Sequence, residues 1–112
     1  MAMLIVDCVT INAVNPSALA QFWSALVGGT PQDAGNSFVL VKPGDGRIPL
    51  LFQRSDAPGA RLGWVHLDCS VEDKDTAIEE IVRLGGQLVE HRSDSNGSWT
   101  VMADPEGNPF CI

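Results

Sequence analysis

The sequence has no run of basic residues and no long apolar stretch. Seven Lys and Arg stand against fourteen Asp and Glu, which gives a formal net charge of −7. We therefore expect no nucleic-acid partner and no binding to anionic membrane surfaces. No apolar stretch approaches the roughly 20 residues that span a bilayer. The first seven residues place no basic segment before their short apolar run, so they do not resemble a secretory signal.

The sequence also lacks closely spaced cysteines. Cys8, Cys69 and Cys111 are far apart, odd in number and form no Cys-x-x-Cys pair. This pattern favours reduced thiols, and hence a cytoplasmic protein, over a disulfide framework. A phosphate-binding loop, a nucleophile elbow and a paired-carboxylate motif are absent too, so the familiar sequence signals of catalysis give no starting point.

The apolar pattern predicts two successive rounds of strand, helix and strands. In the first round we expect a strand at 4–14, a helix at 16–27 capped by Asn15, and strands at 37–41 and 50–54. In the second round we expect a strand at 63–71, a helix at 74–84 capped by Asp73, strands at 87–92 and 98–103, a turn at 104–108, and a last short strand ending at Ile112. Gly28-Gly29 and Gly85-Gly86 end the two helices at corresponding positions. The order of elements indicates a duplicated βαβββ unit.

Both first strands have one apolar and one polar side. Because side chains alternate across a strand, His66, Asp68 and Ser70 share a side, and Cys8, Thr10 and Asn12 share the corresponding side of the earlier strand. The apolar sides suit a core covered by helices, and the polar sides suit a cleft. His66 is the strongest candidate for chemistry, with Asp68 as a base or orienting group if it is not simply solvated or paired.

Three segments together resemble the vicinal-oxygen-chelate superfamily, which includes glyoxalases, bleomycin-resistance proteins and extradiol dioxygenases. They are VNPSALAQFWSALVGG, VHLDCSVEDKDTAIEEIVRLGG and DPEGNPFCI. Within the superfamily the chain most resembles compact glyoxalase-like proteins of bacteria. The resemblance implies an α+β fold in which two tandem βαβββ modules form curved mixed sheets around a shared cleft. It also implies one glyoxalase-like domain over 1–112, with modules at about 1–55 and 63–112 and a linker at about 56–62.

The superfamily's metal-binding positions correspond to Cys8, Gln53, His66 and Cys111 in this chain. His and Glu are usual there, so the sequence departs from the pattern at most positions. This departure from the superfamily's metal pattern favours a protein with no catalytic metal and no cofactor. For His66 three roles stay open: a structural hydrogen bond, contact with an organic ligand, or metal ligation.

We therefore expect a cytoplasmic homodimer that binds a small, partly apolar organic molecule in the cleft between its sheets. Whether it is an enzyme stays open. The alternative is a glyoxalase-like lyase or isomerase that uses a divalent metal with His66 as a ligand. Trp99 and Phe52 could wall the pocket or belong to the core, whereas Phe22 and Trp23 are assigned to packing, Cys69 to the core and His91 to the surface. The expected ligand-binding residues are Cys8, Thr10, Gln53, His66, Asp68, Trp99 and Cys111.

Overall fold

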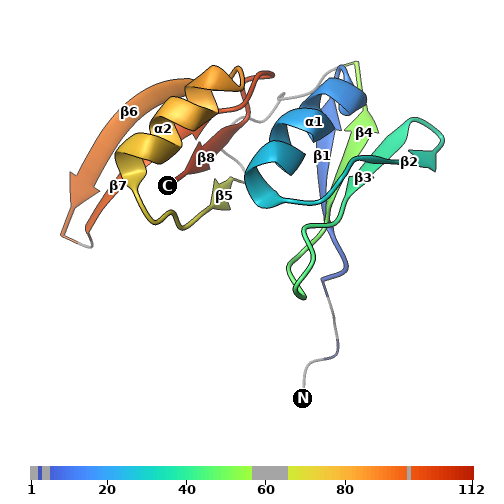
Figure 1. The fold of residues 1–112 in the computed structure, drawn as a ribbon, viewed down its shortest axis with the longest axis horizontal. Coiled ribbons are helices and arrows are strands. Elements are labelled where there is room, and N and C mark those ends of the chain that lie inside the picture. The colour runs from blue at the N-terminus through green and yellow to red at the C-terminus, as the bar shows by residue number, and fades with distance from the viewer. Residues whose placement is uncertain (1–2, 4–5, 57–65, 96) are drawn as a thin grey trace. The chain divides into compact units, whose positions relative to one another are not determined.

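A computed structural model describes residues 3, 6–56, 66–95 and 97–112. The chain forms two compact units, Met1–Pro58 and Gly59–Ile112, and each holds one helix and one four-stranded mixed sheet (Figure 1). The first unit contains β1 (Val9–Ala13), α1 (Pro16–Val27), β2 (Gln32–Gly35), β3 (Phe38–Val41) and β4 (Leu50–Arg54). The second contains β5 (Leu67–Asp68), α2 (Lys74–Arg83), β6 (Gln87–Asp94), β7 (Gly97–Ala103) and β8 (Pro109–Cys111). The fold is α+β with two tandem βαβββ modules, as the sequence predicted.

In the first unit, α1 packs on one face of a sheet with strand order β1-β4-β3-β2. β1 and β4 run parallel, and the other neighbours are antiparallel. The core lies between helix and sheet, where Phe22 and Trp23 pack edge to face with ring centroids 5.5 Å apart. Phe52 is 0% exposed in this core. Of the two roles left open for Phe52, the structure therefore shows core packing.

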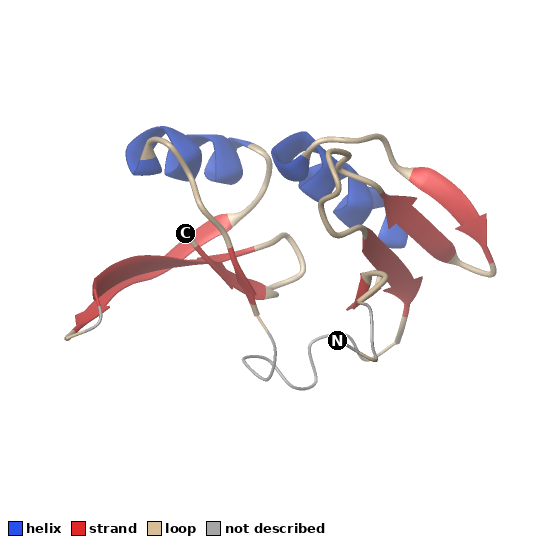
Figure 2. Ribbon diagram, turned by 90° about the horizontal axis from the view of Figure 1, so that it is seen from below, coloured by secondary structure: helices blue, strands red, loops and turns tan. Residues whose placement is uncertain are grey.

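In the second unit the strand order is β5-β8-β7-β6, with β5 parallel to β8. α2 lies on one side of this sheet (Figure 2). Ile81 of α2 is buried together with Met102, Phe110 and Ile112. None of the helices in the described ranges has the length and apolarity needed to cross a membrane.

Both helices begin where the sequence predicted. The Asn15 side chain accepts a hydrogen bond from the amide of Ala18 at 3.1 Å, and the Asp73 side chain accepts one from the amide of Thr76 at 3.0 Å. These contacts satisfy amide groups that have no partner inside the helix. Gly28 is the C-cap of α1, and Gly85, with φ of 109°, follows the C-cap of α2.

The Asp104–Asn108 turn is built around a buried carboxylate. Asp104 is 2% exposed, and its Oδ1 accepts hydrogen bonds from the amides of Glu106 at 3.0 Å and Asn108 at 2.9 Å. The Asn108 side-chain amide also donates to both Asp104 oxygens. The turn delivers the chain into β8 and thereby positions Cys111.

Several strand predictions need correction. β2 was not predicted, because its sequence QDAG has no β-branched or aromatic residue and all four residues are exposed. The first strand begins at Val9 rather than at residue 4; residues 4–5 lie outside the described part of the chain. Among the described residues 66–71 of the strand predicted at 63–71, only β5 is extended, and it pairs with β8, which has three residues. Residues 63–65 and most of the predicted linker at 56–62 lie outside the described residues.

Candidate functional site

Each sheet has one face that its own helix does not cover. In the first sheet, the register places Leu51 between Thr10 and Leu40, and Gln53 between Asn12 and Phe38. Their strand neighbours Val41, Leu50 and Phe52 point into the helix-packed core, so alternation assigns the first set to the opposite face. We call this set the helix-free face of the first sheet: Thr10, Asn12, Phe38, Leu40, Leu51 and Gln53.

Cys8 joins this face from the segment just before β1. Its sulfur lies 3.9 Å from the Thr10 hydroxyl oxygen, and either atom can be the donor. Thr10 and Gln53 are exposed and Cys8 is half-buried. The three predicted site residues of the first unit are therefore on one side of its sheet.

The second sheet places three further predicted residues in one cluster, which we call the His66–Asp68–Cys111 cluster. The His66 Nε2 lies 3.2 Å from Asp68 Oδ1. Asp68 is the register partner of Cys111 across β5 and β8. One donor atom from each of the three side chains lies within 4.8 Å of the other two. An imidazole nitrogen, a carboxylate oxygen and a sulfur thus converge at the exposed end of a parallel strand pair.

The cluster affects the acidity of its thiol. Burial raises the pKa of Cys111, and the negative charge of Asp68 together with a hydrogen bond to that carboxylate raises it further. The positive charge of Arg92 acts in the opposite direction. Burial also raises the pKa of Cys69, with smaller contributions from Asp68 and Cys111. Both thiols therefore stay protonated at neutral pH while no cation is bound.

β7 and β6 extend this surface. Val101 is the register partner of both Cys111 and Glu90, and Trp99 is the partner of Arg92. Trp99 is half-buried, and Arg92 forms an ion pair with Glu90. His91 points to the other side, where its Nδ1 lies 2.9 Å from the hydroxyl oxygen of buried Thr100. The helix-free face of the second sheet therefore carries Asp68, Glu90, Arg92, Trp99, Val101 and Cys111, with His66 beside Asp68.

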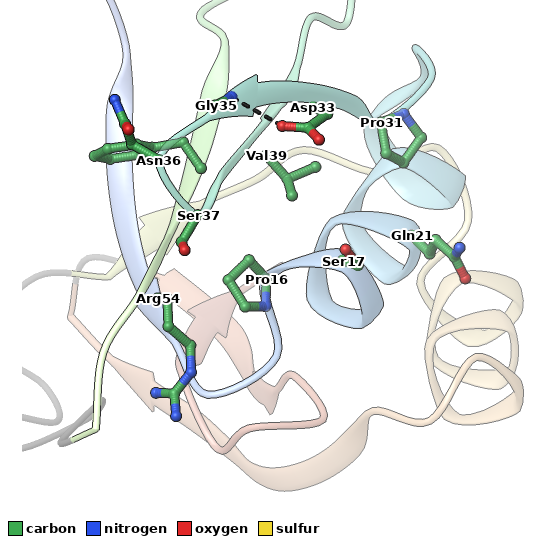
Figure 3. Close-up of a pocket in the computed structure, with 11 residues that line it drawn as sticks. Pro16, Ser17, Gln21, Pro31, Asp33, Gly35, Asn36, Ser37, Val39 and Arg54 are labelled. Atoms are coloured by element: carbon green, nitrogen blue, oxygen red, sulfur yellow. Dashed lines mark hydrogen bonds between the residues drawn. The ribbon is translucent and has the colours of Figure 1, made fainter.

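A separate pocket of about 660 Å³ lies in the first unit between α1 and the β2–β3 hairpin (Figure 3). Pro16, Ser17 and Gln21 line it from the helix, and Asp33 and Asn36 line it from the hairpin. None of the predicted site residues lines this pocket. Sequence reasoning missed this pocket because one of its walls is β2, the strand that was not predicted. The available signal was Gly35-Asn36, a pair that favours hairpin turns. In the structure Gly35, Asn36 and Ser37 all have positive φ.

The donor atoms of the His66–Asp68–Cys111 cluster suit some metals better than others. Nitrogen and sulfur ligands are typical of zinc, which also accepts carboxylate oxygen, whereas magnesium and manganese prefer sites made of oxygen ligands. Sequence reasoning considered His66 and Cys111 as metal positions but treated Asp68 separately. Strand alternation placed His66 and Asp68 on one side, but Asp68 was considered as a base or orienting group and not as a metal ligand.

Comparison with solved structures finds several proteins of similar fold. A glyoxalase/bleomycin resistance protein/dioxygenase family enzyme from Burkholderia phytofirmans PsJN superposes with a TM-score of 0.77 at 18% identity, covering 97% of each chain. The bleomycin-binding protein of Streptomyces verticillus, complexed with copper(II)-bleomycin, gives 0.65 at 22% identity, covering 99% of this chain and 96% of that one. A fosfomycin resistance protein from Listeria monocytogenes, complexed with manganese(II) and 1S,2S-dihydroxypropylphosphonic acid, gives 0.75 at 14% identity, covering 99% and 89%.

At these identities the solved structures establish the fold alone, and no curated protein sequence matches the chain. The family model described as a glyoxalase-like domain matches residues 8–112. That range includes both βαβββ modules and all seven predicted site residues. The chain therefore belongs to the glyoxalase-like domain family.

Proposed function

We propose that this protein binds a small, partly apolar organic molecule against the helix-free faces of its sheets. The observation that carries the proposal is the composition of the face on the first sheet. Half-buried Phe38, Leu40 and Leu51 lie beside exposed Thr10 and Gln53 on the same face. Small-molecule sites combine an apolar lining with a few polar groups that fix the ligand's orientation, and this face has both.

The helix-free face of the second sheet is the more polar of the two faces. Trp99 and Val101 offer apolar surface, and His66, Asp68 and Cys111 offer hydrogen-bonding groups next to it. The bleomycin-binding protein among the structural neighbours supports the general class of ligand. We propose that Cys8, Thr10 and Gln53 are the ligand-binding residues of the first sheet, and that His66, Asp68, Trp99 and Cys111 are those of the second.

Native mass spectrometry of freshly purified protein tests this proposal directly. We expect a bound organic molecule, or binding after incubation with a panel of small amphipathic compounds. The substitutions Thr10→Val and Gln53→Leu remove polar groups from the proposed face at similar volume and should weaken retention. Arg47→Leu, an exposed change between β3 and β4, is the matched control. Equal retention in all variants would show that the ligand binds elsewhere.

The second candidate function is a lyase or isomerase that depends on a divalent metal. The convergence of His66, Asp68 and Cys111 favours it, because a bound divalent ion would polarise a substrate oxygen at that cluster. The sequence-based expectation of a metal-free site rested on Cys8, Gln53, His66 and Cys111, which include no carboxylate. Treatment with a chelator separates the candidates: ligand retention is unaffected in the first and lost in the second.

We also propose that the protein is a homodimer in a reducing compartment, the cytoplasm. β6 is eight residues long, exposed throughout, and pairs only with β7 among the described strands. Exposed strand edges are commonly covered by a partner, and a second copy related by a two-fold axis would cover this one. The three cysteines are free, which supports the compartment.

A further inference from the structure

We propose that the His66–Asp68–Cys111 cluster binds one divalent ion of the zinc class, with all three protein ligands supplied by the second unit alone. This inference shares its residues with the metal-dependent candidate function but does not require catalysis. It differs from the ligand set implied by the family resemblance, which draws on both modules. Asp68 is the added ligand, and Cys8 and Gln53 have no part in it.

The distances in the cluster are close to those that zinc requires. Zinc bonds to nitrogen, oxygen and sulfur are about 2.0–2.3 Å, so neighbouring ligand atoms in a tetrahedral site lie roughly 3.3–3.8 Å apart. His66 Nε2 and Asp68 Oδ1 are already 3.2 Å apart, and the full set of ligand atoms lies within 4.8 Å. A shift of about 1 Å in the ligand atoms is enough to reach ligation distance. The exposed side chains of His66 and Asp68 can make this shift by rotating about their side-chain bonds.

The backbone fixes the relative positions of the ligands. β5 and β8 are parallel neighbours with Asp68 in register with Cys111, and the Cys69 amide donates to the Cys111 carbonyl at 2.8 Å. His66 precedes Asp68 by two residues and so approaches from the same side of the strand. The Asp104 turn holds the start of β8 in place. Three protein ligands of this kind leave a fourth tetrahedral position for water or an organic ligand.

The chemistry of the three ligands selects among divalent ions. Thiolate and imidazole favour zinc and cobalt over magnesium and manganese, which prefer six oxygen ligands. The Cys111 thiol must lose its proton to solvent when the ion binds, so binding strengthens as pH rises. Asp68 supplies negative charge to the site, whereas Arg92, paired with Glu90, is the nearby cation that opposes the ion.

Cobalt(II) titration of the reduced, chelator-treated full chain tests the proposal, because a thiolate bound to cobalt gives a near-ultraviolet charge-transfer band. We expect one cobalt per chain, displaced by zinc and not by manganese. Cys111→Ser should abolish the charge-transfer band. His66→Ala and Asp68→Asn should weaken cobalt affinity by more than about tenfold, since even outer partners of a metal site are worth 10- to 100-fold.

Cys69→Ser, Cys8→Ser and Gln53→Ala are the controls, and we expect each to bind cobalt as the unmodified chain does. Absence of the charge-transfer band in the unmodified chain would overturn the proposal. A weakened site in Cys8→Ser or Gln53→Ala would also overturn it, in favour of a site shared between modules. Binding of an organic molecule, measured with chelator present, is a separate readout and tests the proposed small-molecule function independently.

Discussion

Asp68 acts on two neighbours at once. Its carboxylate pairs with His66 and contributes to the raised pKa of Cys111. Strand alternation predicted that His66 and Asp68 share a side. It could not predict that Cys111 joins them, because that depends on the register between β5 and β8, two strands more than forty residues apart in sequence.

The first prediction concerns the ionisation of Cys111. Because the Asp68 charge disfavours the thiolate, Asp68→Asn should lower the Cys111 pKa and move its alkylation profile to lower pH. Burial is the larger cause and remains, so the pKa should stay above that of an exposed thiol. Mass spectrometry of iodoacetamide labelling against pH, in chelator, measures this. Asp75→Asn on α2 is the control, and an unchanged profile in Asp68→Asn would contradict the assignment.

The second prediction concerns the buried Asp104 carboxylate. Asp104→Ala leaves the amides of Glu106 and Asn108 without their acceptor, and should lower the free energy of unfolding by about 1–3 kcal/mol. Urea denaturation measures the change. Asp56→Ala removes only an exposed ion pair with Arg54, so it should cost less than about 1 kcal/mol. Equal losses in the two variants would show that Asp104 does not organise the turn.

The second glycine of each Gly-Gly pair is required for a reason that the sequence did not show. A Cβ on Gly29, which has φ of +85°, would lie 2.3 Å from the Lys42 carbonyl oxygen. A Cβ on Gly86 would lie 2.6 Å from Ile81 Cγ2 and 2.9 Å from the Ala103 carbonyl oxygen. In each unit the second glycine thus lets the chain pass close to other backbone. Sequence patterns correctly predicted helix ends there, but the close approach appears only in three dimensions.

The third prediction separates that contact from backbone strain. Gly29→Ala should destabilise the protein by more than Gly44→Ala, which has a similar φ of +88° but open space around the new Cβ. The strain is worth about 1–2 kcal/mol in both variants, and only Gly29→Ala adds a clash with backbone. Thermal and urea unfolding of the two variants compare them. Similar losses would mean that the loop beside Gly29 moves away without cost.

The accuracy of the element predictions followed the strength of the local signals. Both helices were predicted well because a capping residue, an apolar stripe and a glycine pair agreed at each. β2 was missed and β5 was overestimated because their limits are set by pairing with neighbouring strands. A strand's own residues carry little information about how long its partner is.

The assembly provides a fourth prediction. If a second copy covers the exposed edge of β6, light scattering at micromolar concentration should give twice the 12.0 kDa mass of one chain. Val89→Lys places a charge beside that edge, where Val89 is 54% exposed, and should shift the equilibrium toward monomer. Val82→Lys on α2, 49% exposed, is the matched control. A mass of one chain for the unmodified protein would contradict the homodimer.

For the whole chain, family and architecture were predictable because three separated segments matched one superfamily, and the family model now covers residues 8–112. Strand alternation grouped Cys8 with Thr10 and His66 with Asp68, but it did not show that Cys111 joins the second pair. The structure brings Cys8 to Thr10 and joins His66, Asp68 and Cys111, and it adds a pocket beside α1 that no sequence pattern indicated.

That pocket gives the central proposal a direct competitor within the first unit. Amide chemical-shift mapping during titration with small amphipathic compounds distinguishes the two locations. Binding at the helix-free faces predicts the largest shifts at Thr10, Gln53 and Val101, with little change at Ser17 and Gln21. Shifts confined to Ser17, Gln21 and Asn36 would place the ligand between α1 and the β2–β3 hairpin, and would contradict the proposed function.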